Sequence, residues 1–192
     1  MWFNPSEFIY STNRAKVEST YNSFFRNGLL IDTEMLYLLI VGNYDAIEKT
    51  NFITELGFDE ADYENLRRFL NSLSKISNFY ITPHVFTKFV HLLWEKIKDK
   101  QHYHNIADLF MSNFSYIGEK YISKDKILEM EHFKTKYCDL CNASLILTSE
   151  IHSHNSVITG DKKFANICEE RGNILVVYYP DIRTNIISNP QD

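Results

Sequence analysis

The sequence predicts an α/β domain in which a parallel β-sheet is covered by helices on both faces. Short apolar runs of strand length alternate along the chain with longer stretches of helical periodicity, a pattern typical of parallel strands joined by helical crossovers. The chain has 192 residues, which fits one domain better than two. No internal repeat, low-complexity tract or linker divides the chain, so we expect a single domain.

In the first half of the chain, we expect two strands that are each followed by helices. The apolar run 28–32 is expected to be the first strand, and residues 33–40 then form a buried helix. A second, amphipathic helix is expected to start at Asp59, and a second strand at residues 78–82 is closed by Pro83. A long helix follows Pro83. The apolar residues at helical spacing in the two amphipathic helices are Tyr63, Leu66, Phe69, Leu70 and Leu73, then Val85, Phe89, Leu92, Leu93 and Ile97.

The second half is expected to contain three more strands and three more helices. We place helices at 102–118, 142–151 and 161–171, and strands at 120–123, 156–159 and 174–178. The predicted domain covers residues 28–180. It is preceded by an extension, residues 1–27, with a helix at 15–26, and followed by a polar tail, residues 181–192, which we expect to fray.

Charge and composition exclude several classes of function. The formal net charge of −5 counts against a protein that binds nucleic acid over a wide basic surface. The chain has no glycine-rich phosphate loop and no Gly-x-Ser-x-Gly motif, so nucleotide-binding and serine-hydrolase functions are not expected. The start of the chain does not read as a signal peptide, and the longest apolar stretch, residues 36–42, is too short to span a bilayer. Three cysteines are expected to be reduced thiols, which favours the cytoplasm.

Two acidic residues follow predicted strands. Asp32 closes the first strand, and Asp161 lies two residues beyond the strand that ends at Thr159. In open α/β sheets, ligands bind outside the carboxyl ends of the strands, and acids that converge there suit a hydrated Mg²⁺ or Mn²⁺ ion. Each acid taken alone also has a simpler interpretation, because Asp161 and Asp139 stand where a helix N-cap is expected.

Four segments together resemble the motifs of the PIN-domain nucleases. The order, spacing and strand–helix context of these segments agree with the family over about residues 28–180, and Gly172 with residues 174–178 matches its final strand. The four segments are Leu30-Ile31-Asp32-Thr33-Glu34, residues 81–88, Asn142-Ala143-Ser144-Leu145-Ile146, and residues 157–165. The resemblance implies a three-layer α/β/α fold around a five-stranded parallel sheet. It also implies Mg²⁺- or Mn²⁺-dependent cleavage of RNA, and many members of the family are toxins with a cognate antitoxin and often pair as homodimers.

The chain departs from the family pattern at two of the four acidic positions. Lys88 stands where the family has Glu, and Asn142 stands where it has the third Asp. A lysine in a cation site competes with the metal, and asparagine offers only a neutral oxygen. Glu34 and Asp139 are the acids that could compensate, Glu34 two residues after Asp32 and Asp139 three residues before Asn142.

The resemblance and the strand ends together give the candidate site. We expect metal binding by Asp32, Asp161 and Asp139, and chemistry by these three residues with Glu34. The residues expected on the substrate side are Lys88, His84, Asn142 and Thr159.

Two further patterns have a simpler interpretation. His84, Lys88, His91 and Glu95 share one helical stripe, which we interpret as a solvated helix face, with phosphate contact as the alternative. The pair Cys138-x-x-Cys141 has the spacing of a redox or zinc motif, but no second ligand pair is nearby, so ordinary buried thiols are expected.

The sequence therefore leaves three hypotheses. The first is a metal-dependent endoribonuclease with an incomplete carboxylate site. The second is a PIN-fold protein that has lost the chemistry and acts by binding RNA or a protein. The third is an unrelated doubly wound domain in which the acids are only helix caps.

Overall fold

The structure is a computed structural model of the chain, and it describes residues 27–74, 77–130, 138–151 and 156–181. Five parallel strands form one sheet in the order β3-β2-β1-β4-β5. The strands are β1 (Leu29–Ile31), β2 (Phe79–Ile81), β3 (Ile117–Glu119), β4 (Ser156–Thr159) and β5 (Leu175–Tyr178). This confirms the predicted α/β class and the five-stranded parallel sheet.

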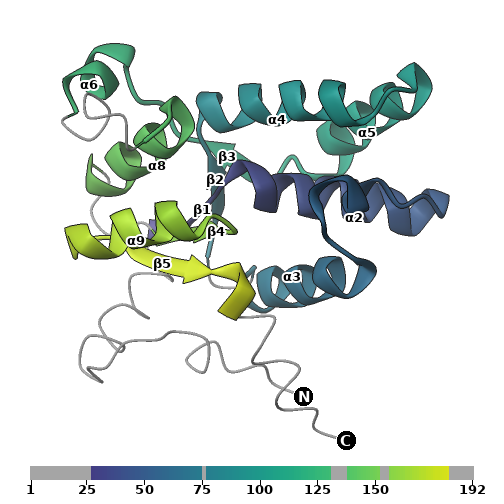
Figure 1. Cartoon of the computed structure of the whole chain (residues 1–192), viewed down its shortest axis with the longest axis horizontal. Helices are drawn as coiled ribbons and strands as arrows, with labels where there is room; N and C mark the ends of the chain where they lie inside the picture. Colours follow the sequence, from purple (N-terminus) through teal and green to yellow (C-terminus); the bar gives the residue numbers. More distant parts are fainter. Residues whose placement is uncertain (1–26, 75–76, 131–137, 152–155, 182–192) are drawn as a thin grey trace, which may run out of the picture.

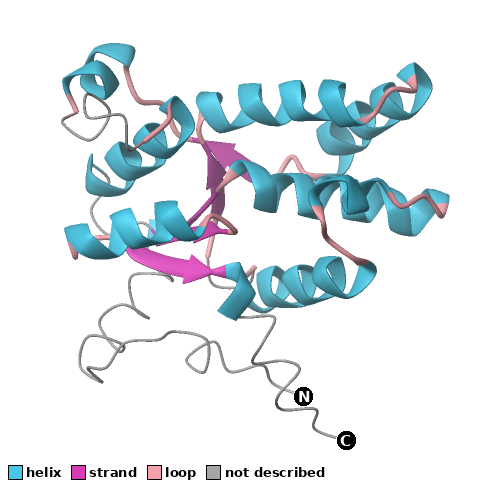
Figure 2. Cartoon of the chain, in the orientation of Figure 1, coloured by secondary structure: helices cyan, strands magenta, loops and turns pink. Residues whose placement is uncertain are grey.

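Helices cover both faces of the sheet (Figures 1 and 2). One layer contains α2 (Thr33–Glu48), the 3₁₀ helix η2 (Phe52–Leu56), α3 (Glu60–Leu73), α4 (Pro83–Lys96) and α5 (Lys100–Asn113). The other layer contains α6 (Lys124–Glu129), α8 (Leu140–Ile151) and α9 (Lys162–Arg171). The two layers follow from right-handed crossovers, because the chain moves outward from β1 to β3 and then crosses back to β4 and β5. The fold is therefore a three-layer α/β/α arrangement.

The core is centred on α2, which lies against the sheet and contacts α3, α4 and α5. Every residue from Met35 to Val41 is at most 4% exposed, so this helix is buried almost all round rather than along one stripe. Its neighbour α3 is amphipathic and turns Leu66, Phe69 and Leu73 toward the core, as the sequence predicts. No helix within the described residues is long and apolar enough to cross a membrane.

The predicted elements differ from the structure mainly around the edge strand. The predicted helix 102–118 is wrong at its end, because α5 stops at Asn113, and the predicted strand 120–123 is wrong, because β3 occupies residues 117–119. Gly118 explains why β3 lies at residues 117–119. A Cβ at this position would lie 2.9 Å from two ring carbons of Tyr80, so the missing side chain lets β3 pair beside a large aromatic ring.

The other four strands and the remaining predicted helices agree with the structure to within about two residues, apart from the first helix, whose start was correct but which runs on to Glu48. The helices η2 and α6 were not predicted from the sequence. The helix predicted at 15–26 and the polar tail beyond residue 181 lie outside the described residues.

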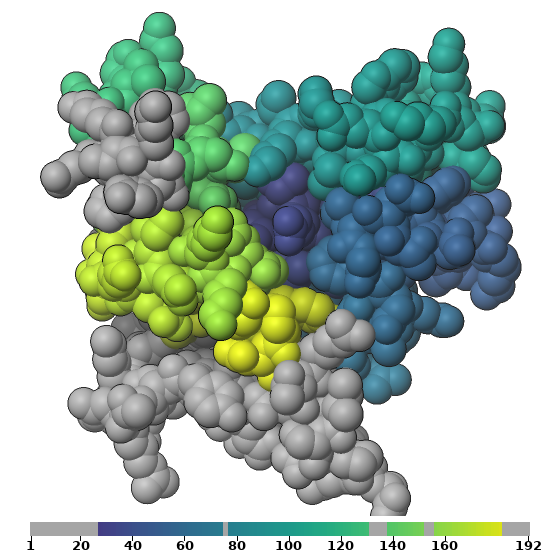
Figure 3. Space-filling view, in the orientation of Figure 1, coloured from purple at the N-terminus to yellow at the C-terminus, as the bar shows by residue number. Residues whose placement is uncertain are grey.

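The carboxyl ends of all five strands lie at one edge of the sheet, since the strands are parallel. Helices α2, α4 and α9 begin at that edge, because each directly follows a strand. Helix α8 also begins there, because it carries the chain back across the sheet to the start of β4. In the space-filling view, the start of the described chain (purple) lies in a recess between α9 (yellow-green) and the blue surface of α3 (Figure 3). This edge holds the residues that the sequence singles out.

Candidate functional site

Three aspartates at the carboxyl edge each begin a helix. Asp32, Asp139 and Asp161 accept a hydrogen bond from a main-chain N–H in the first turn of α2, α8 and α9, at 2.8 Å in each case. Such caps satisfy N–H groups that have no partner inside the helix. The partial positive charge of three helix N-termini also favours carboxylates at this edge. The capping interpretation of Asp139 and Asp161 is therefore confirmed, and Asp32 caps α2 in the same way. Capping explains how several like charges are tolerated together.

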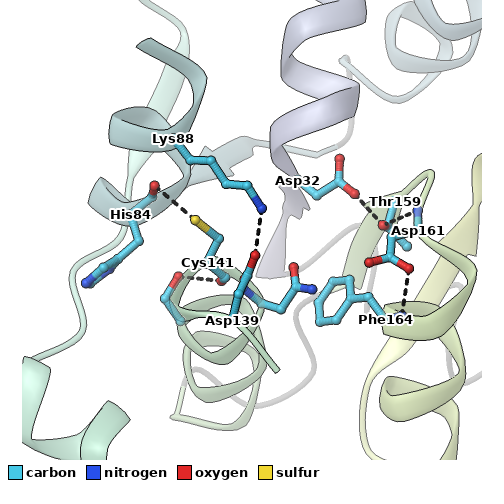
Figure 4. A network of polar contacts seen from close by, with 10 residues as sticks. Asp32, His84, Lys88, Asp139, Cys141, Thr159, Asp161 and Phe164 are labelled. Atoms are coloured by element: carbon cyan, nitrogen blue, oxygen red, sulfur yellow. Dashed lines mark hydrogen bonds and ion pairs between the residues drawn. The ribbon is translucent and has the colours of Figure 1, made fainter. Parts of the chain in front are cut away.

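Thr159 ties the end of β1 to the end of β4 (Figure 4). Its hydroxyl donates to Oδ2 of Asp32 and accepts from the main-chain N–H of Asp161 at 3.0 Å. The N–H of Gly160 also donates to Oδ2 of Asp32, at 3.3 Å. Asp32 is 5% exposed and Thr159 is fully buried, so Thr159 holds the two acids in place and does not face a substrate.

Burial raises the pKa values of two carboxyl groups at this edge, those of Asp32 and Glu34. Burial raises the pKa of Asp32 to about 7, against the lowering effect of its bonds to Thr159 and Met35. Partial burial and the neighbouring carboxylate of Asp161 raise the pKa of Glu34, and the ammonium group of Lys88 opposes that rise. Raised carboxyl pKa values are more common at functional sites than elsewhere, although buried structural acids also have them.

Glu34 approaches the same turn from α2. A Cβ on Gly160 would lie 3.0 Å from Oε2 of Glu34, so the glycine makes room for this carboxylate. Gly160, which also donates to Asp32, was not among the site residues expected from the sequence. The sequence signal was its place between Thr159 and Asp161, while the close approach of Glu34 to this glycine appears only in the tertiary structure.

Lys88 and Asp139 form an ion pair on the α8 side of the site. Nζ of Lys88 lies 2.6 Å from Oδ2 of Asp139, and both side chains are about half exposed. Partial burial alone would lower the pKa of Lys88, but the hydrogen bond and the charge of Asp139 outweigh it, so the pKa is raised. The pKa of Asp139 is lowered, because its bonds to the N–H of Asn142 and to Lys88 outweigh its partial burial.

The carboxylate oxygens of the site differ in whether they accept hydrogen bonds from the described residues. Both oxygens of Asp32 accept hydrogen bonds, and so do both oxygens of Asp139. Within the described residues, Oδ2 of Asp161 and the carboxylate of Glu34 accept none. No group of three or more His, Cys, Asp or Glu side chains in the described part of the chain is arranged to hold a metal ion. Oxygen donors from two carboxylates nevertheless fit Mg²⁺, which usually binds one or two carboxylates and keeps several waters.

The remaining predicted site residues are His84 and Asn142, and they lie to one side of the carboxylates. The carbonyl of His84 accepts a bond from the thiol of Cys141, and the ring of His84 points away from Lys88 and Asp139 (Figure 4). Its Nδ1 is buried and has no partner among the described residues. Asn142 is partly exposed in the first turn of α8 and caps onto Asp139 through its N–H. Neither residue joins the carboxylates of Asp32, Glu34 and Asp161.

The three cysteines are free and buried, so we expect them to be unreactive. Burial raises the pKa of Cys138 to about 12 and that of Cys141 to about 11, and it raises the pKa of Cys168 further still. Because the thiolate is the nucleophile, the native protein at pH 7.5 should react with a thiol reagent such as DTNB at least about 100-fold more slowly than free cysteine. Rapid reaction of Cys138 and Cys141 in the folded protein would contradict this expectation, and urea-unfolded protein provides the control.

No protein-family model, no curated protein and no solved structure matches the chain. The resemblance to the PIN-domain nucleases therefore rests on the motifs, their order and their positions at the carboxyl edge of the sheet.

Proposed function

We propose that this protein is a PIN-like endoribonuclease that hydrolyses RNA phosphodiester bonds with the help of Mg²⁺ or Mn²⁺. The observation that carries the proposal is the convergence of Asp32, Glu34 and Asp161 around the turn at Gly160, where the pKa values of Asp32 and Glu34 are raised. Carboxyl groups held in mutual repulsion gain from a cation placed between them.

We assign a different role to each acid of the site. Asp161 and Glu34 would hold the cation, because their carboxylates have oxygens that accept no hydrogen bond from the described residues. A bound divalent ion would supply an activated water and neutralise charge on the phosphate. Asp32 keeps the ends of β1 and β4 in register through Thr159 and Gly160. In hydrolysis, the oxygen of water bonds to phosphorus as the phosphorus–oxygen bond to the next nucleotide breaks; the water gives up a proton, and the leaving oxygen takes up one to become a hydroxyl group.

In this proposal, Lys88 pairs with an acid of the chain instead of competing with the metal. Its ion pair with Asp139 holds the ammonium group at the start of α8. A phosphate group could exchange with Asp139 for this ammonium, since ammonium–phosphate contacts are favourable and the pair is half exposed. Asp139 therefore serves to position Lys88 in our proposal and is not a metal ligand.

The ion pair also favours a second candidate function. Lys88 supplies a fixed positive charge within reach of Glu34, so the acidic edge is partly neutralised by the chain itself. A protein of this kind would bind RNA or a protein partner without cleaving it. Three buried thiols are consistent with a cytoplasmic location under either function.

The test is RNA cleavage by the full chain in Mn²⁺, comparing the wild type with Asp161→Asn. Asparagine caps a helix about as well as aspartate, so this variant should fold normally. We expect cleavage to fall at least about 100-fold, because the change removes a charged ligand. Asp125→Asn on the exposed start of α6 is the matched control and should cleave like the wild type.

Two results would count against the proposal. Equal cleavage by wild type and Asp161→Asn would remove Asp161 from the site. A folded wild type that neither cleaves RNA nor gains thermal stability in Mn²⁺ would support the non-catalytic alternative.

A further inference from the structure

The exposed face of α4 carries a row of side chains that leads away from the acidic edge. Lys88, His91 and Trp94 follow one another at intervals of three residues, so they are neighbours on the helix surface. All three are exposed, and so is Lys98, which follows just beyond the end of the helix. We call these four residues the α4 ridge. Lys88 and Trp94 are six residues apart, or about 9 Å along the helix axis.

Trp94 is the unusual member of the ridge. It is 58% exposed, although a tryptophan side chain on a soluble domain is normally well buried. Its ring meets the ring of Tyr103 on α5 at 5.6 Å between centroids, in a T-shaped arrangement. Tyr103 in turn contacts the ring of His104. An oriented and accessible indole of this kind is suited to stacking on a flat aromatic ligand.

The support beneath the ridge is fixed to the core of the domain. The hydroxyl of Tyr44 on α2 lies 2.7 Å from Nδ1 of His102 on α5. The ring of His102 also packs against Phe52 at 5.2 Å. Asp99 caps the start of α5 through the N–H groups of Gln101 and His102. The turn between α4 and α5 is therefore attached to α2, and Tyr103 is held in place below Trp94.

The charge around the turn is locally positive in a chain whose formal net charge is −5. Lys96, Lys98 and Lys100 alternate along it, while Glu95 and Asp99 are its acids. Glu95 lies 3.5 Å from Nδ1 of His91, and Asp99 is engaged as a helix cap. Lys98 and Lys100 are exposed, so their ammonium groups are accessible to phosphate.

We infer that the α4 ridge binds single-stranded RNA, with a base stacked on Trp94 and phosphates contacted by Lys98 and Lys88. Aromatic side chains beside lysines are the general means of holding a single strand without reading its sequence. Because Lys88 is both the end of the ridge and a neighbour of Glu34, a strand on the ridge would lead toward the carboxylates. The inference deepens the proposed function and rests on it for the fate of the RNA, but binding itself needs no cleavage.

The experiment measures binding of a fluorescein-labelled U12 RNA by fluorescence anisotropy, in EDTA and 50 mM KCl so that no cleavage occurs. Trp94→Ala should weaken binding about 10-fold, and Trp94→Phe should keep most of the affinity, since a ring remains for stacking. Lys98→Glu should also weaken binding, and it should lower the slope of log Kd against log salt by about 1. Exposed residues of α6 supply the matched controls, Leu128→Ala and Lys126→Glu, which should bind like the wild type.

The outcomes separate this inference from the proposed function. Trp94→Ala and Lys98→Glu proteins that bind U12 as tightly as the wild type would overturn the ridge, whether or not the wild type cleaves RNA. Loss of binding in both variants, in a protein that never cleaves RNA, would support the ridge and reject the nuclease. If Trp94→Ala leaves RNA binding unchanged and instead turns a dimer into a monomer in light scattering, the face is a protein interface and the inference is wrong.

Discussion

Asp32→Asn is expected to stabilise the fold at pH 8 and to do so much less at pH 5. The carboxyl group has a pKa of about 7 in the folded protein, against an ordinary value of 3.8 that applies to the unfolded chain. The contribution of Asp32 to the free energy of unfolding is therefore most favourable below pH 3.8, where the group is protonated in both states, and it becomes less favourable as the pH rises toward 7. The full shift of about three pKa units corresponds to roughly 4 kcal/mol. Asparagine cannot ionise, so it escapes this cost.

The measurement is urea unfolding of wild type and Asp32→Asn in EDTA at both pH values. The difference in free energy of unfolding should grow by about 2–3 kcal/mol in favour of asparagine between pH 5 and pH 8. Asparagine can still cap α2, but it presents an N–H group to one of the donors around Thr159 or Gly160, which reduces the gain at every pH by a similar amount. A difference that stays constant with pH would show that Asp32 is ionised normally in the folded protein. Asp125→Asn on α6 is the control for the substitution itself.

A buried acid whose neutral replacement stabilises the protein is retained for a reason other than stability. Sites of function commonly carry this cost, because the arrangement that suits chemistry is not the one that suits folding. Increased stability together with reduced cleavage in Asp32→Asn is the combined result expected from the proposed function, because asparagine cannot accept from both Thr159 and Gly160, which hold the turn that leads to Asp161.

Gly28→Ala is expected to destabilise the fold by about 3 kcal/mol or more. Gly28 has φ of 86°, and a Cβ there would lie 2.4 Å from a ring carbon of Tyr80 and 2.6 Å from the carbonyl oxygen of Asn78. That carbonyl cannot retreat freely, because it accepts the N–H of Leu29 at 2.8 Å where β1 starts to pair with β2. The alanine would thus add both backbone strain and a clash to the central strand.

Gly172→Ala is the matched comparison for this result. Gly172 ends α9 with φ of 70°, but nothing lies within 4 Å of its would-be Cβ. Only the left-handed backbone is penalised there, so a loss of about 1 kcal/mol is expected. Urea unfolding of both variants measures the difference, and equal losses would mean that the contacts of Gly28 with Tyr80 and Asn78 relax on substitution.

The sequence predicted the strands well where burial makes them apolar on both sides. Strands β1 and β4 are completely buried, so each appears as a short apolar run that ends in a polar residue. Strand β3 lies at the edge and is only partly buried, so its three residues Ile117, Gly118 and Glu119 carry no such run. Its position depends on the ring of Tyr80, which is distant in the sequence.

The candidate site was predictable in its position and not in its connections. Because parallel strands end at one edge, Asp32 and Asp161 had to lie near each other once the strands were identified. The sequence also correctly marked Asp139 and Asp161 as helix caps. It could not show that Thr159 bonds to Asp32 across 127 positions, or that Lys88 pairs with Asp139 across 51.

The sequence by itself thus determined the α/β class, four of the five strands and the edge at which the acids gather, because these follow from local patterns of apolar and polar residues. Only the tertiary structure decided which carboxylate oxygens are engaged, where the ammonium group of Lys88 is held, and that Gly160 admits Glu34 to the site. Hydrogen bonds and ion pairs depend on distances of a few ångströms between segments far apart in the chain, and no local pattern specifies those distances.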